Sequence, residues 1–518
     1  MLVGDIVRRN AVFHGDFDAV VVPGGVTRTW RELDARTNRF ANALHDLGLG
    51  KGDRIAIYAP NCSEYVEFYF GTAKSGVIGA ATNVRLAAYE TGSYLAYVEP
   101  AAVLVHADLL TTAREWLDSV PSVKHLIGFG GDHGLDLDLE DLLARASDAD
   151  PHVPLTEDDI YQLGATSGTT GIPKGAILTH RNAISAMTTW SAELDIREHD
   201  TALQNIPYFF NPGGPSGLHP VLIKGGRTIV PPAFDPAEFP VLVERYQVTH
   251  TIIVPTMVQM VVTNPAAEQH DLSSLRGIFS GGSPFPAPVL VRAREVIGDV
   301  FHPIYGMAES YSCGTILRSQ NLFTEGTEQQ RRQLGSIGKP ETLVQLRVVD
   351  TDGNDVPHDG ETSGEIWLSG PCISPGYYNM PEETANSRHG EWFRTGDVAV
   401  IDSEGFITIV DRLKDMIITG GINVFSIEVE RVLEAHPAVG QVAVIGVPHP
   451  QWGEAIHAVV CVREGASVTA DELMDFAATR LTPYKKPRSI EFVTALPVSA
   501  TGKVLKKELR ARYDASRS

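Results

Sequence analysis

Apolar residues in the first third of the chain alternate between the spacing of helices and that of strands. Thr29-Trp-Arg-Glu32 has the form of a capping box, which starts a helix by binding its free amide groups. From Leu33 to Leu47 apolar residues recur at helical spacing, until Gly48 ends the pattern. Residues 54–58 form a short apolar run typical of a buried strand, and a second helix is expected over residues 63–74. Strands that alternate with helices predict α/β layers around a largely parallel sheet.

Later segments of the chain contain further strand candidates, and before residue 400 the helical spacing gives way to β-rich segments. Residues 102–105, 228–230 and 251–254 are further strand candidates. Residues 343–351 and 363–369 are β-rich, are separated by Asp-Gly and Ser-Gly pairs, and show little helical spacing. These two segments indicate a β-subdomain.

The chain after Lys414 has a different order of elements. A helix, two strands and a second helix are expected at residues 427–434, 442–445, 458–462 and 472–481. About a hundred residues of this kind are enough for a separate small domain of mixed helix and sheet.

The composition is that of a globular protein. Its length of 518 residues predicts several compact units rather than one. Hydrophobic residues make up 43% and charged residues 21%, which excludes a disordered or fibrous chain. With 43 Lys and Arg against 64 Asp and Glu, the net charge of -21 repels phosphate backbones, so nucleic acid is not expected as a partner. A local basic pocket for a nucleotide stays compatible with this charge.

The sequence gives no sign of a membrane segment or of export. No apolar run reaches the roughly 18 residues that a membrane span needs, and charge follows Met1 too early for a signal peptide. The four cysteines are far apart and form no C-x-x-C pair: Cys62, Cys313, Cys372 and Cys461. We therefore expect neither a disulfide framework nor a zinc site, and we expect a cytoplasmic location.

The strongest local signal is the segment Thr166-Ser-Gly-Thr-Thr-Gly-Ile-Pro-Lys-Gly175. Its glycines let backbone N–H groups approach an anion, its hydroxyls add donors, and Lys174 adds a charge suited to phosphate. The spacing departs from G-x-x-x-x-G-K-[ST], so the segment is not a Walker A loop. A flexible linker is the alternative, which the apolar segments on either side disfavour.

This segment resembles the signature loop T-S-G-T-T-G-x-P-K-G of the adenylate-forming superfamily of acyl-CoA synthetases, peptide-synthetase adenylation domains and luciferases. The superfamily's other motifs follow in the same order, so that the resemblance covers residues 29–507, nearly the whole chain. One such motif is weak, but six in order are specific. Tyr305-Gly-Met-Ala-Glu309 resembles Y-G-x-T-E, Trp392-Phe-Arg-Thr-Gly-Asp397 resembles W-x-x-T-G-D, Asp411-Arg-Leu-Lys-Asp-Met-Ile417 resembles the interdomain hinge, Gly420-Gly-Ile-Asn-Val424 resembles G-G-E-N-V, and Pro497-Val-Ser-Ala-Thr-Gly-Lys503 resembles P-x-x-x-T-G-K.

The resemblance implies the fold and the reaction. It implies an α/β fold with an N-terminal AMP-binding domain, residues 1–411, made of two α/β subdomains and a β-subdomain. Residues 412–414 would form a hinge to a small mobile α+β domain, residues 415–518. The implied enzyme is an AMP-forming acid–thiol ligase, an acyl-CoA synthetase, which makes an acyl-adenylate and then an acyl-CoA thioester. Its implied cofactors are ATP, Mg²⁺ and coenzyme A, and its partner is a small-molecule carboxylic acid; a homodimer stays open.

Three residues are expected to be catalytic. Adenylation brings two anions together and expels pyrophosphate, so it needs cations and oriented donors where charge develops. By resemblance, Lys503 bridges the carboxylate and the α-phosphate, and Lys174 serves the phosphates. Glu309 would hold Mg²⁺, a hard cation that prefers carboxylate oxygen. Without the resemblance, Lys503 is also compatible with a basic surface tail, and Glu309 with an acid on a helix surface.

Other residues are expected to bind the nucleotide. By resemblance, Asp397 and Arg412 bind the ribose hydroxyls, and Tyr305 stacks on adenine. Taken alone, Asp397 would more often be a turn residue after Gly396, and Tyr305 would usually be a core aromatic. The remaining expected contacts come from small or hydroxyl residues, namely Thr166, Ser167, Gly168, Thr169, Thr170, Gly171, Gly281, Gly282, Ser283, Gly306, Gly420 and Gly421.

The second half-reaction is expected to need domain alternation. Lys414 stands where the superfamily has its hinge residue, and rotation there would replace Lys503 by the Gly420-Gly421 loop. The smooth backbone of this loop can line a tunnel for the pantetheine thiol. No G-x-S-x-G elbow occurs in the sequence, so a serine-hydrolase route lacks support. Only fifteen residues follow Lys503, too few for a carrier domain, so the acceptor is expected to come from outside.

The acyl pocket is expected at Pro207–Gly214, where bulky rings stand beside glycines. This combination favours a medium-chain fatty acid or an aromatic acid. Asn211 is equally compatible with a substrate contact and with a cap of the turn before Pro212. The expected lining is Phe209, Phe210, Asn211, Gly213, Gly214, Thr256 and Met307, together with Gly281 and Tyr305.

Three departures from the superfamily pattern leave details open. Phe210 and Asn211 stand where many relatives have His, and Ala308 replaces a Thr whose hydroxyl would contact phosphate. Ile422 replaces the usual Glu, and Ser426 the usual Pro. An adenylating enzyme that passes the acyl group to a carrier protein, an amine or another nucleophile therefore stays open. So do a catalytically inactive nucleotide-binding protein and a luciferase-like oxygenase.

Overall fold

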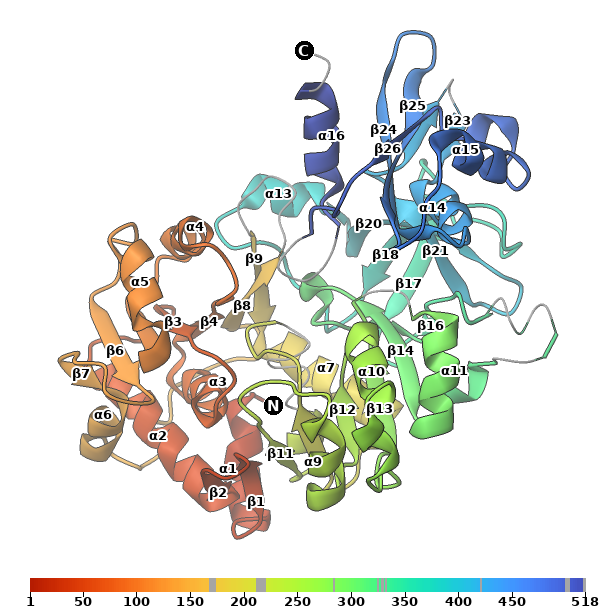
Figure 1. Ribbon diagram of the computed structural model, residues 1–518. Helices are drawn as coiled ribbons and strands as arrows, with labels where there is room; N and C mark the ends of the chain where they lie inside the picture. The colour runs from red at the N-terminus through yellow and green to blue at the C-terminus, as the bar shows by residue number, and fades with distance from the viewer. Residues whose placement is uncertain are drawn as a thin grey trace. The chain divides into compact units, whose positions relative to one another are not determined.

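The computed structural model describes residues 1–166, 174–210, 220–282, 285–323, 326–327, 330, 333–419, 422–498 and 504–515 (Figure 1). The chain divides into two compact units. Unit 1 contains Met1–Leu346 and Leu368–Phe393, and unit 2 contains Arg347–Trp367 and Arg394–Ser518.

Unit 1 contains a seven-stranded sheet that is parallel except for its last pair. Strands β8 and β9 form an antiparallel hairpin, and all other neighbours in this sheet run parallel. The order is β7 (Leu137–Asp138), β6 (His125–Phe129), β5 (Ala102–His106), β3 (Arg54–Tyr58), β4 (Ile78–Ala81), β8 (Ile160–Thr166) and β9 (Lys174–Thr179).

A nine-stranded sheet forms the other half of unit 1. Its six central strands are parallel, and its edges are antiparallel hairpins. The order is β16 (Lys339–Pro340), β15 (Gly314–Ile316), β14 (Phe301–Gly306), β13 (Gly277–Ser280), β12 (His250–Ile252), β10 (Thr201–Gln204), β11 (Arg227–Ile229), β1 (Asp18–Val21) and β2 (Thr27–Thr29). The expected pair of α/β subdomains with largely parallel sheets is confirmed.

Helices connect and cover the strands of unit 1. The helix after β2 begins as predicted, because the Thr29 hydroxyl accepts from the Glu32 amide and the Glu32 carboxylate accepts from the Thr29 amide. The α-helices are α1 (Gly4–Phe13), α2 (Trp30–Asp46), α3 (Ser63–Ser75), α4 (Ala88–Val98), α5 (Leu110–Leu117), α6 (Leu139–Arg145), α7 (His180–Glu193), α9 (Glu238–Tyr246), α10 (Pro255–Val262), α11 (Ala287–Val296) and α13 (Pro381–Asn386).

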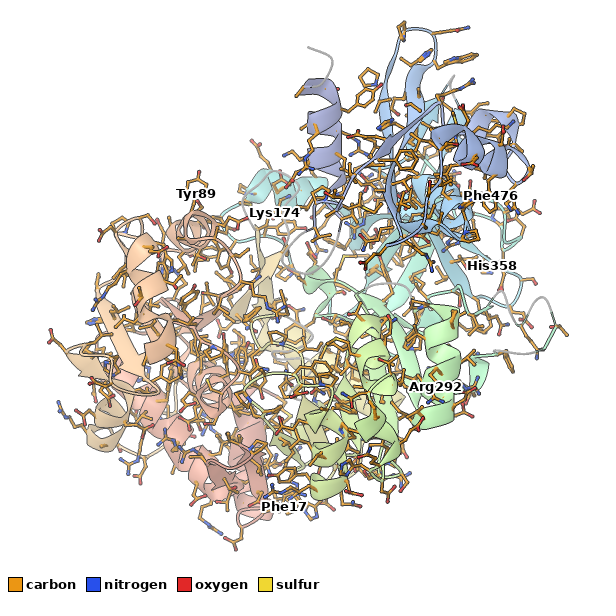
Figure 2. All side chains as sticks on the ribbon, viewed as in Figure 1. Phe17, Tyr89, Lys174, Arg292, His358 and Phe476 are labelled. Atoms are coloured by element: carbon orange, nitrogen blue, oxygen red, sulfur yellow. The ribbon has the colours of Figure 1, made fainter. Side chains whose placement is uncertain are left out.

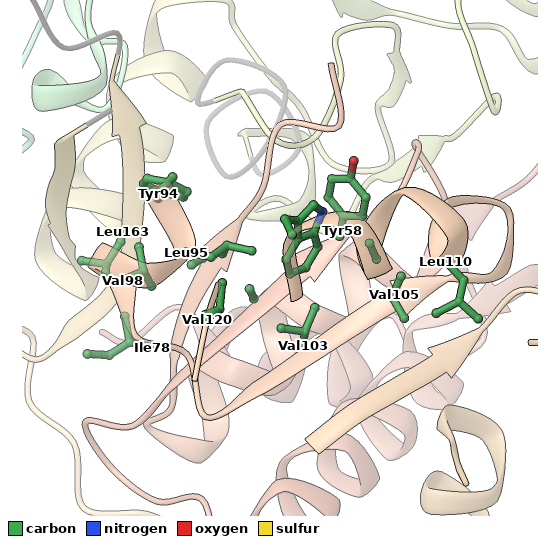
Figure 3. Packing of buried hydrophobic residues seen from close by; sticks show 14 residues of the cluster. Tyr58, Ile78, Tyr94, Leu95, Val98, Val103, Val105, Leu110, Val120 and Leu163 are labelled. Carbon is green, nitrogen blue, oxygen red and sulfur yellow. The ribbon is translucent and has the colours of Figure 1, made fainter. Parts of the chain in front are cut away.

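The seven-stranded sheet is buried on both faces. Tyr58 and Val103 pack with α4 and α5 in one core cluster (Figure 3), in which the Tyr58 ring meets the Trp116 ring edge to face at 5.4 Å. Such an aromatic pair adds about 0.5–1.5 kcal/mol to the burial term. Ile57 and Leu104, whose side chains alternate to the opposite face, are 0% exposed as well. Helices therefore cover both faces, as parallel sheets require.

Unit 2 contains the β-rich segment and the small C-terminal domain. The predicted strands before residue 400 are β17 (Gln345–Val349) and β18 (Gly364–Ser369); β20 (Trp392–Ile401) pairs antiparallel with β21 (Ile407–Arg412). The C-terminal sheet has the order β23 (Ile422–Val424), β22 (Ile417–Thr419), β25 (Gly453–Val462), β24 (Val439–His449), with β26 (Ser489–Phe492) beside β25. Its helices are α14 (Ser426–Glu434), α15 (Ala470–Ala478) and α16 (Lys506–Ala515), and the predicted order helix, strand, strand, helix is confirmed.

The C-terminal sheet has a different set of helices on each face. Val444 and Ile456 belong to the core cluster that contains residues of α14 and α15. Ile445 and Ala455 point to the other face and pack in the cluster that contains Leu509 of α16. Two strands therefore hold three helices through side chains that alternate between the faces.

None of the helices in the described parts of the chain combines the length and the apolar character that a membrane crossing requires. The four cysteines are free thiols, three of them buried.

Candidate active site

Four parallel strands of the nine-stranded sheet end next to predicted site residues. Neighbouring parallel strands place their carboxyl ends at the same sheet edge, and α/β sheets bind ligands outside that edge. Strand β14 ends with Tyr305 and Gly306, β13 is followed by Gly281 and Gly282, β12 by Thr256, and β10 by Phe209 and Phe210. These strands are neighbours in the order β14, β13, β12, β10. The fold thus brings seven predicted site residues from four sequence segments to one edge.

Gly306 is required by a close backbone contact. A Cβ atom at this position would lie 2.1 Å from the carbonyl oxygen of Ser312. The chain between them turns tightly, with the Ser312 amide donating to the Met307 carbonyl at 2.8 Å. This turn carries the short helix η3 (Ala308–Ser310) and with it Glu309. The Tyr-Gly motif therefore has a structural reason that is independent of any ligand.

The hairpin β8–β9 presents Lys174 beside the loop that the sequence singles out. Thr166 ends β8 and pairs with Lys174, the first residue of β9. The Lys174 side chain is 13% exposed and forms an ion pair with Glu383 in the first turn of α13. Its ammonium group lies 5.0 Å from the centre of the Tyr377 ring, which is within the range of cation–π attraction. Figure 2 labels Lys174 on the ribbon.

Glu309 is held by the segment that contains Tyr377. The Tyr377 hydroxyl donates to Oε1 of Glu309 at 2.7 Å, and the Ser374 amide donates to the Glu309 carbonyl at 2.6 Å. Burial, followed by the negative charge of Glu309, raises the pKa of Tyr377 well above its usual value. The phenol therefore remains a donor at neutral pH.

Sequence reasoning missed Tyr377, Ser374 and Glu383. A signal was present, because Pro375-Gly376 followed by two tyrosines indicates a turn that leads into a strand. The segment 376–378 does pair with β9: the Ile177 amide donates to the Gly376 carbonyl, and the Tyr378 amide to the Gly175 carbonyl, both at 2.9 Å. The two paired segments are about 200 residues apart in sequence. Only their pairing reveals that segment 376–378 belongs to the site.

In unit 2, Asp397 and Arg412 face each other across β20 and β21. They are register partners, and Nε of Arg412 lies 2.9 Å from Oδ1 of Asp397. The Asp397 side chain is 4% exposed and that of Arg412 38%. The sequence predicted a shared role for this pair, and the structure brings the two side chains together.

A buried carboxylate that sequence reasoning missed supports the Thr-Gly-Asp turn. Glu365 accepts from the Trp367 indole at 2.8 Å, from Nε of Arg394 at 3.1 Å and from the Gly396 amide at 3.1 Å. Gly396 has φ +72°, a left-handed conformation that favours glycine. Glu365 thus fixes the turn from which Asp397 projects.

Lys414 lies in a turn directly after β21. The Asp415 and Met416 amides both donate to the Arg412 carbonyl at 2.9 Å, so the chain reverses at this point. Partial desolvation and the neighbouring Arg412 guanidinium lower the pKa of Lys414. Arg510 of α16 pairs with Asp415 at 3.0 Å. A short exposed turn is the type of segment that absorbs rotation.

Two aromatic rings stand at the predicted acyl pocket. Phe209 is 8% exposed and meets Phe210 edge to face at 4.7 Å. The guanidinium of Arg85, which sequence reasoning did not consider, lies 6.0 Å from the Phe209 ring centre. Thr256 is exposed and Met307 is half-buried.

Other predicted residues lie outside the described residues. These are Ser167, Gly168, Thr169, Thr170, Gly171, Asn211, Gly213, Gly214, Ser283, Gly420, Gly421 and Lys503.

Glu309 is the carboxylate that would hold Mg²⁺ in this site. Within the described ranges, no group of three or more His, Cys, Asp or Glu side chains lies together as a metal site. Mg²⁺ keeps several waters and is commonly bound by one or two carboxylates plus substrate phosphates. Glu309 fits that mode, because Tyr377 binds its Oε1 and leaves its Oε2 for the metal ion. A single carboxylate is not a metal site on its own, so the phosphates of the nucleotide would have to complete it.

Comparisons with known proteins agree with this geometry. The AMP-binding enzyme family matches residues 7–378, and the AMP-binding enzyme C-terminal domain matches residues 428–503. The chain belongs to the AMP-binding enzyme family and thereby to the adenylate-forming superfamily.

Relatives and solved structures cover nearly the whole chain. Feruloyl-CoA synthase from an Amycolatopsis species is 38% identical over 490 residues, which cover 95% of both chains. Long-chain-fatty-acid–CoA ligase FadD13 from Mycobacterium tuberculosis is 33% identical over 520 residues, 99% of both. The structure of ATP-bound MatB from Rhodopseudomonas palustris has a TM-score of 0.87 at 29% identity and covers 100% of both chains.

Proposed function

We propose that this protein is an ATP-dependent carboxylate–CoA ligase. In the first half-reaction a carboxylate oxygen attacks the α-phosphorus of ATP and pyrophosphate leaves. In the second the thiol of coenzyme A attacks the acyl carbon, and AMP leaves with the oxygen that came from the carboxylate. The observation that carries this proposal is the arrangement in unit 1, where Tyr377 contacts both Lys174 and Glu309.

The charges of the proposed site match the first half-reaction. Lys174 supplies a positive charge for the phosphates, and Glu309 supplies the carboxylate that would hold Mg²⁺. When bound, Mg²⁺ would neutralise phosphate charge as pyrophosphate leaves. Lys503 would bridge the carboxylate and the α-phosphate, a role that we propose from its motif.

The nucleotide contacts form a second part of the proposal. Asp397 would accept from the ribose hydroxyls, and Arg412 would donate to them. Tyr305 would stack on adenine, beside Gly281, Gly282 and Ser283. The ion pair between Asp397 and Arg412 supports this assignment, because it places an acceptor and a donor within reach of one diol.

The second half-reaction is proposed to use a rotation at Lys414. We keep the division into residues 1–411, 412–414 and 415–518 as part of this proposal. The turn at Lys414 supports it, because the Asp415 and Met416 amides both donate to the Arg412 carbonyl and so form a short turn at this point. The Gly420-Gly421 loop would then line the path of the thiol.

We propose that the acid is aromatic or of medium chain length. The edge-to-face rings of Phe209 and Phe210 support a flat or apolar acyl group. A relative named feruloyl-CoA synthase supports the aromatic acid, and one named medium/long-chain-fatty-acid–CoA ligase supports the fatty acid. The free thiols support our proposal of a cytoplasmic location.

A different acceptor is the second candidate. Ile422, which stands where the superfamily has Glu, is 45% exposed beside the Gly420-Gly421 positions. Because the usual carboxylate is missing there, the acceptor stays open between coenzyme A, a carrier protein and an amine.

Product analysis distinguishes the two candidates. A panel of aromatic and fatty acids is incubated with ATP, Mg²⁺ and coenzyme A, and the products are identified by mass spectrometry. An acyl-CoA with AMP supports the ligase, whereas acyl-adenylate without thioester supports the second candidate. Absence of both products with every acid would refute adenylation.

A further inference from the structure

We propose that Tyr377 is a positioning residue that holds the phosphate-side lysine, Lys174, and the proposed metal ligand, Glu309, in one unit. This inference rests on the proposed function of these two residues. It assigns a task to a side chain that belongs to none of the sequence motifs quoted above.

The strand pairing places Tyr377 next to Lys174. Ala176 of β9 and Tyr377 are bridge partners in an antiparallel pair. Side chains two residues apart on a strand share a face, so Lys174 and Ala176 project to the same side as Tyr377. Lys174 and Tyr377 are therefore diagonal neighbours, a relation in which long and aromatic side chains reach each other.

The two ends of the Tyr377 side chain make different contacts. The ring lies below the Lys174 ammonium at 5.0 Å, and the hydroxyl donates to Glu309 Oε1 at 2.7 Å. A donor on Oε1 restricts rotation of the carboxylate and leaves Oε2 for a cation. Partners of this kind orient carboxylate ligands, and their loss commonly costs about 10–100-fold in metal affinity or activity.

The backbone of the same segment is fixed independently of the hydroxyl. The Tyr377 amide donates to the Thr384 hydroxyl at 2.9 Å, and Ser374 anchors the Glu309 carbonyl. A variant that loses only the hydroxyl thus keeps the strand pairing and the position of the ring. This makes Tyr377→Phe a selective test of the contact with Glu309.

The charged groups around Tyr377 have opposite signs. Glu309 and Glu383 are the carboxylates and Lys174 is the cation. Glu383 pairs with Lys174 and does not receive the hydroxyl. Removal of the hydroxyl is therefore expected to change the carboxylate at Glu309 and to leave the charge at Lys174 in place.

The experiment measures nucleotide binding rather than turnover. Isothermal titration gives the affinity for α,β-methylene-ATP, once with Mg²⁺ and once with EDTA, and the ratio of the two affinities reports the metal contribution. We expect Tyr377→Phe to lower this ratio about 10-fold, with an unchanged affinity in EDTA and a melting temperature near that of the native chain. Tyr377→Leu should also weaken binding in EDTA, because the ring beneath Lys174 is lost.

Two controls set the scale. Glu309→Gln removes the proposed metal ligand and gives the lowest ratio, and Tyr378→Phe removes a neighbouring hydroxyl and should leave the ratio unchanged. If folded Tyr377→Phe has a ratio equal to or above the native one while Glu309→Gln still lowers it, the inference about Tyr377 is wrong. The proposed role of Glu309 then stands. A native chain without any Mg²⁺ effect overturns both this inference and the proposed role of Glu309.

Discussion

Asp397 and Arg412 form an ion pair of 2.9 Å across strands β20 and β21, so that the two proposed ribose-binding groups are each other's partner in the structure. The pair is asymmetric, because the carboxylate is nearly buried and the guanidinium is more than one third exposed. Glu365 fixes the turn behind the carboxylate through the Gly396 amide. The acceptor is therefore held rigidly, while the donor keeps access to solvent.

Replacement of the buried carboxylate is expected to weaken ATP binding. Asp397→Asn turns a charged acceptor into a neutral group, and a hydrogen bond to a charged group contributes about 1.5–3 kcal/mol. We expect the KM for ATP to rise at least tenfold. Asp355→Asn is the matched control, since Asp355 also pairs with an arginine of unit 2 but is 66% exposed. Equal effects of the two substitutions on KM would contradict the ribose assignment.

Lys503 is expected to act in one half-reaction only. Loss of one preorganised electrostatic donor costs about 10²–10³ in rate. Lys503→Ala should therefore slow formation of the acyl-adenylate by that factor, while thioester formation from supplied acyl-adenylate survives much better. Lys507→Ala, an exposed lysine four residues further on, serves as the control. An equal loss of rate in both assays would show that Lys503 does not act in the first half-reaction only.

Glu383 is expected to compete with the nucleotide for Lys174. The Lys174 ammonium has to leave this carboxylate in order to bind phosphate. Glu383 is 42% exposed, so the ion pair contributes only about 0.5–1 kcal/mol after solvent screening. Glu383→Gln should tighten ATP binding about two- to fivefold, as measured by titration calorimetry. The neighbouring Glu382→Gln should have no effect, and an unchanged affinity in Glu383→Gln would rule out the competition.

The turn at Lys414 is expected to be the hinge. Proline fixes φ at about -65° and blocks rotation. Lys414→Pro should keep one half-reaction, which we expect to be adenylation, and suppress the other, whereas Lys414→Ala should retain both. The two half-reactions are measured separately, by pyrophosphate release and by consumption of supplied acyl-adenylate. Native rates for both in the proline variant would place the hinge elsewhere.

Glu341 is expected to make stability depend on pH. Burial raises its pKa from 4.5 to about 8, although the Gly314 amide, which donates to Oε2, opposes the shift. Between these two values the folded chain binds one proton more than the unfolded chain. The free energy of unfolding should therefore fall as pH rises through this window, by at most about 1.4 kcal/mol per pH unit, and level off above it.

The variant Glu341→Gln tests this dependence, because an amide does not titrate. Its melting temperature relative to the native chain should rise from pH 5 to pH 8, the window that the pKa of Glu341 spans. Glu115→Gln, at an exposed helical position, is the control. Parallel curves for Glu341→Gln and the native chain would mean that Glu341 is ionised in both states.

Local patterns predicted much of the fold. The capping box at Thr29 and the strand at residues 54–58 depend on neighbouring residues alone, so the sequence was sufficient for them. A shared role for Asp397 and Arg412 was predicted from their motifs, whereas the ion pair between them is a finding of the structure.

Contacts between distant segments were beyond prediction. Tyr377 joins the site only because segment 376–378 pairs with β9, and no local spacing indicates this pairing. Ser426 is a second example: at the position of a usual proline, its amide and hydroxyl both donate to the buried Asp411, and its hydroxyl accepts from Lys506 at 2.6 Å. Ser426, which departs from the superfamily pattern, is thus part of a hydrogen-bond network. Proline could not form this network, because it has neither the amide hydrogen nor the hydroxyl.

Transfer of an oxygen atom from the acid to AMP is the direct test of an acyl-adenylate intermediate. An accepted acid labelled with ¹⁸O in its carboxylate is incubated with the enzyme, ATP, Mg²⁺ and coenzyme A, and AMP is examined by mass spectrometry. Attack of the carboxylate on the α-phosphorus, followed by cleavage of the acyl carbon–oxygen bond, should leave one ¹⁸O atom in each AMP. Unlabelled AMP, or ADP with labelled phosphate, would contradict an acyl-adenylate.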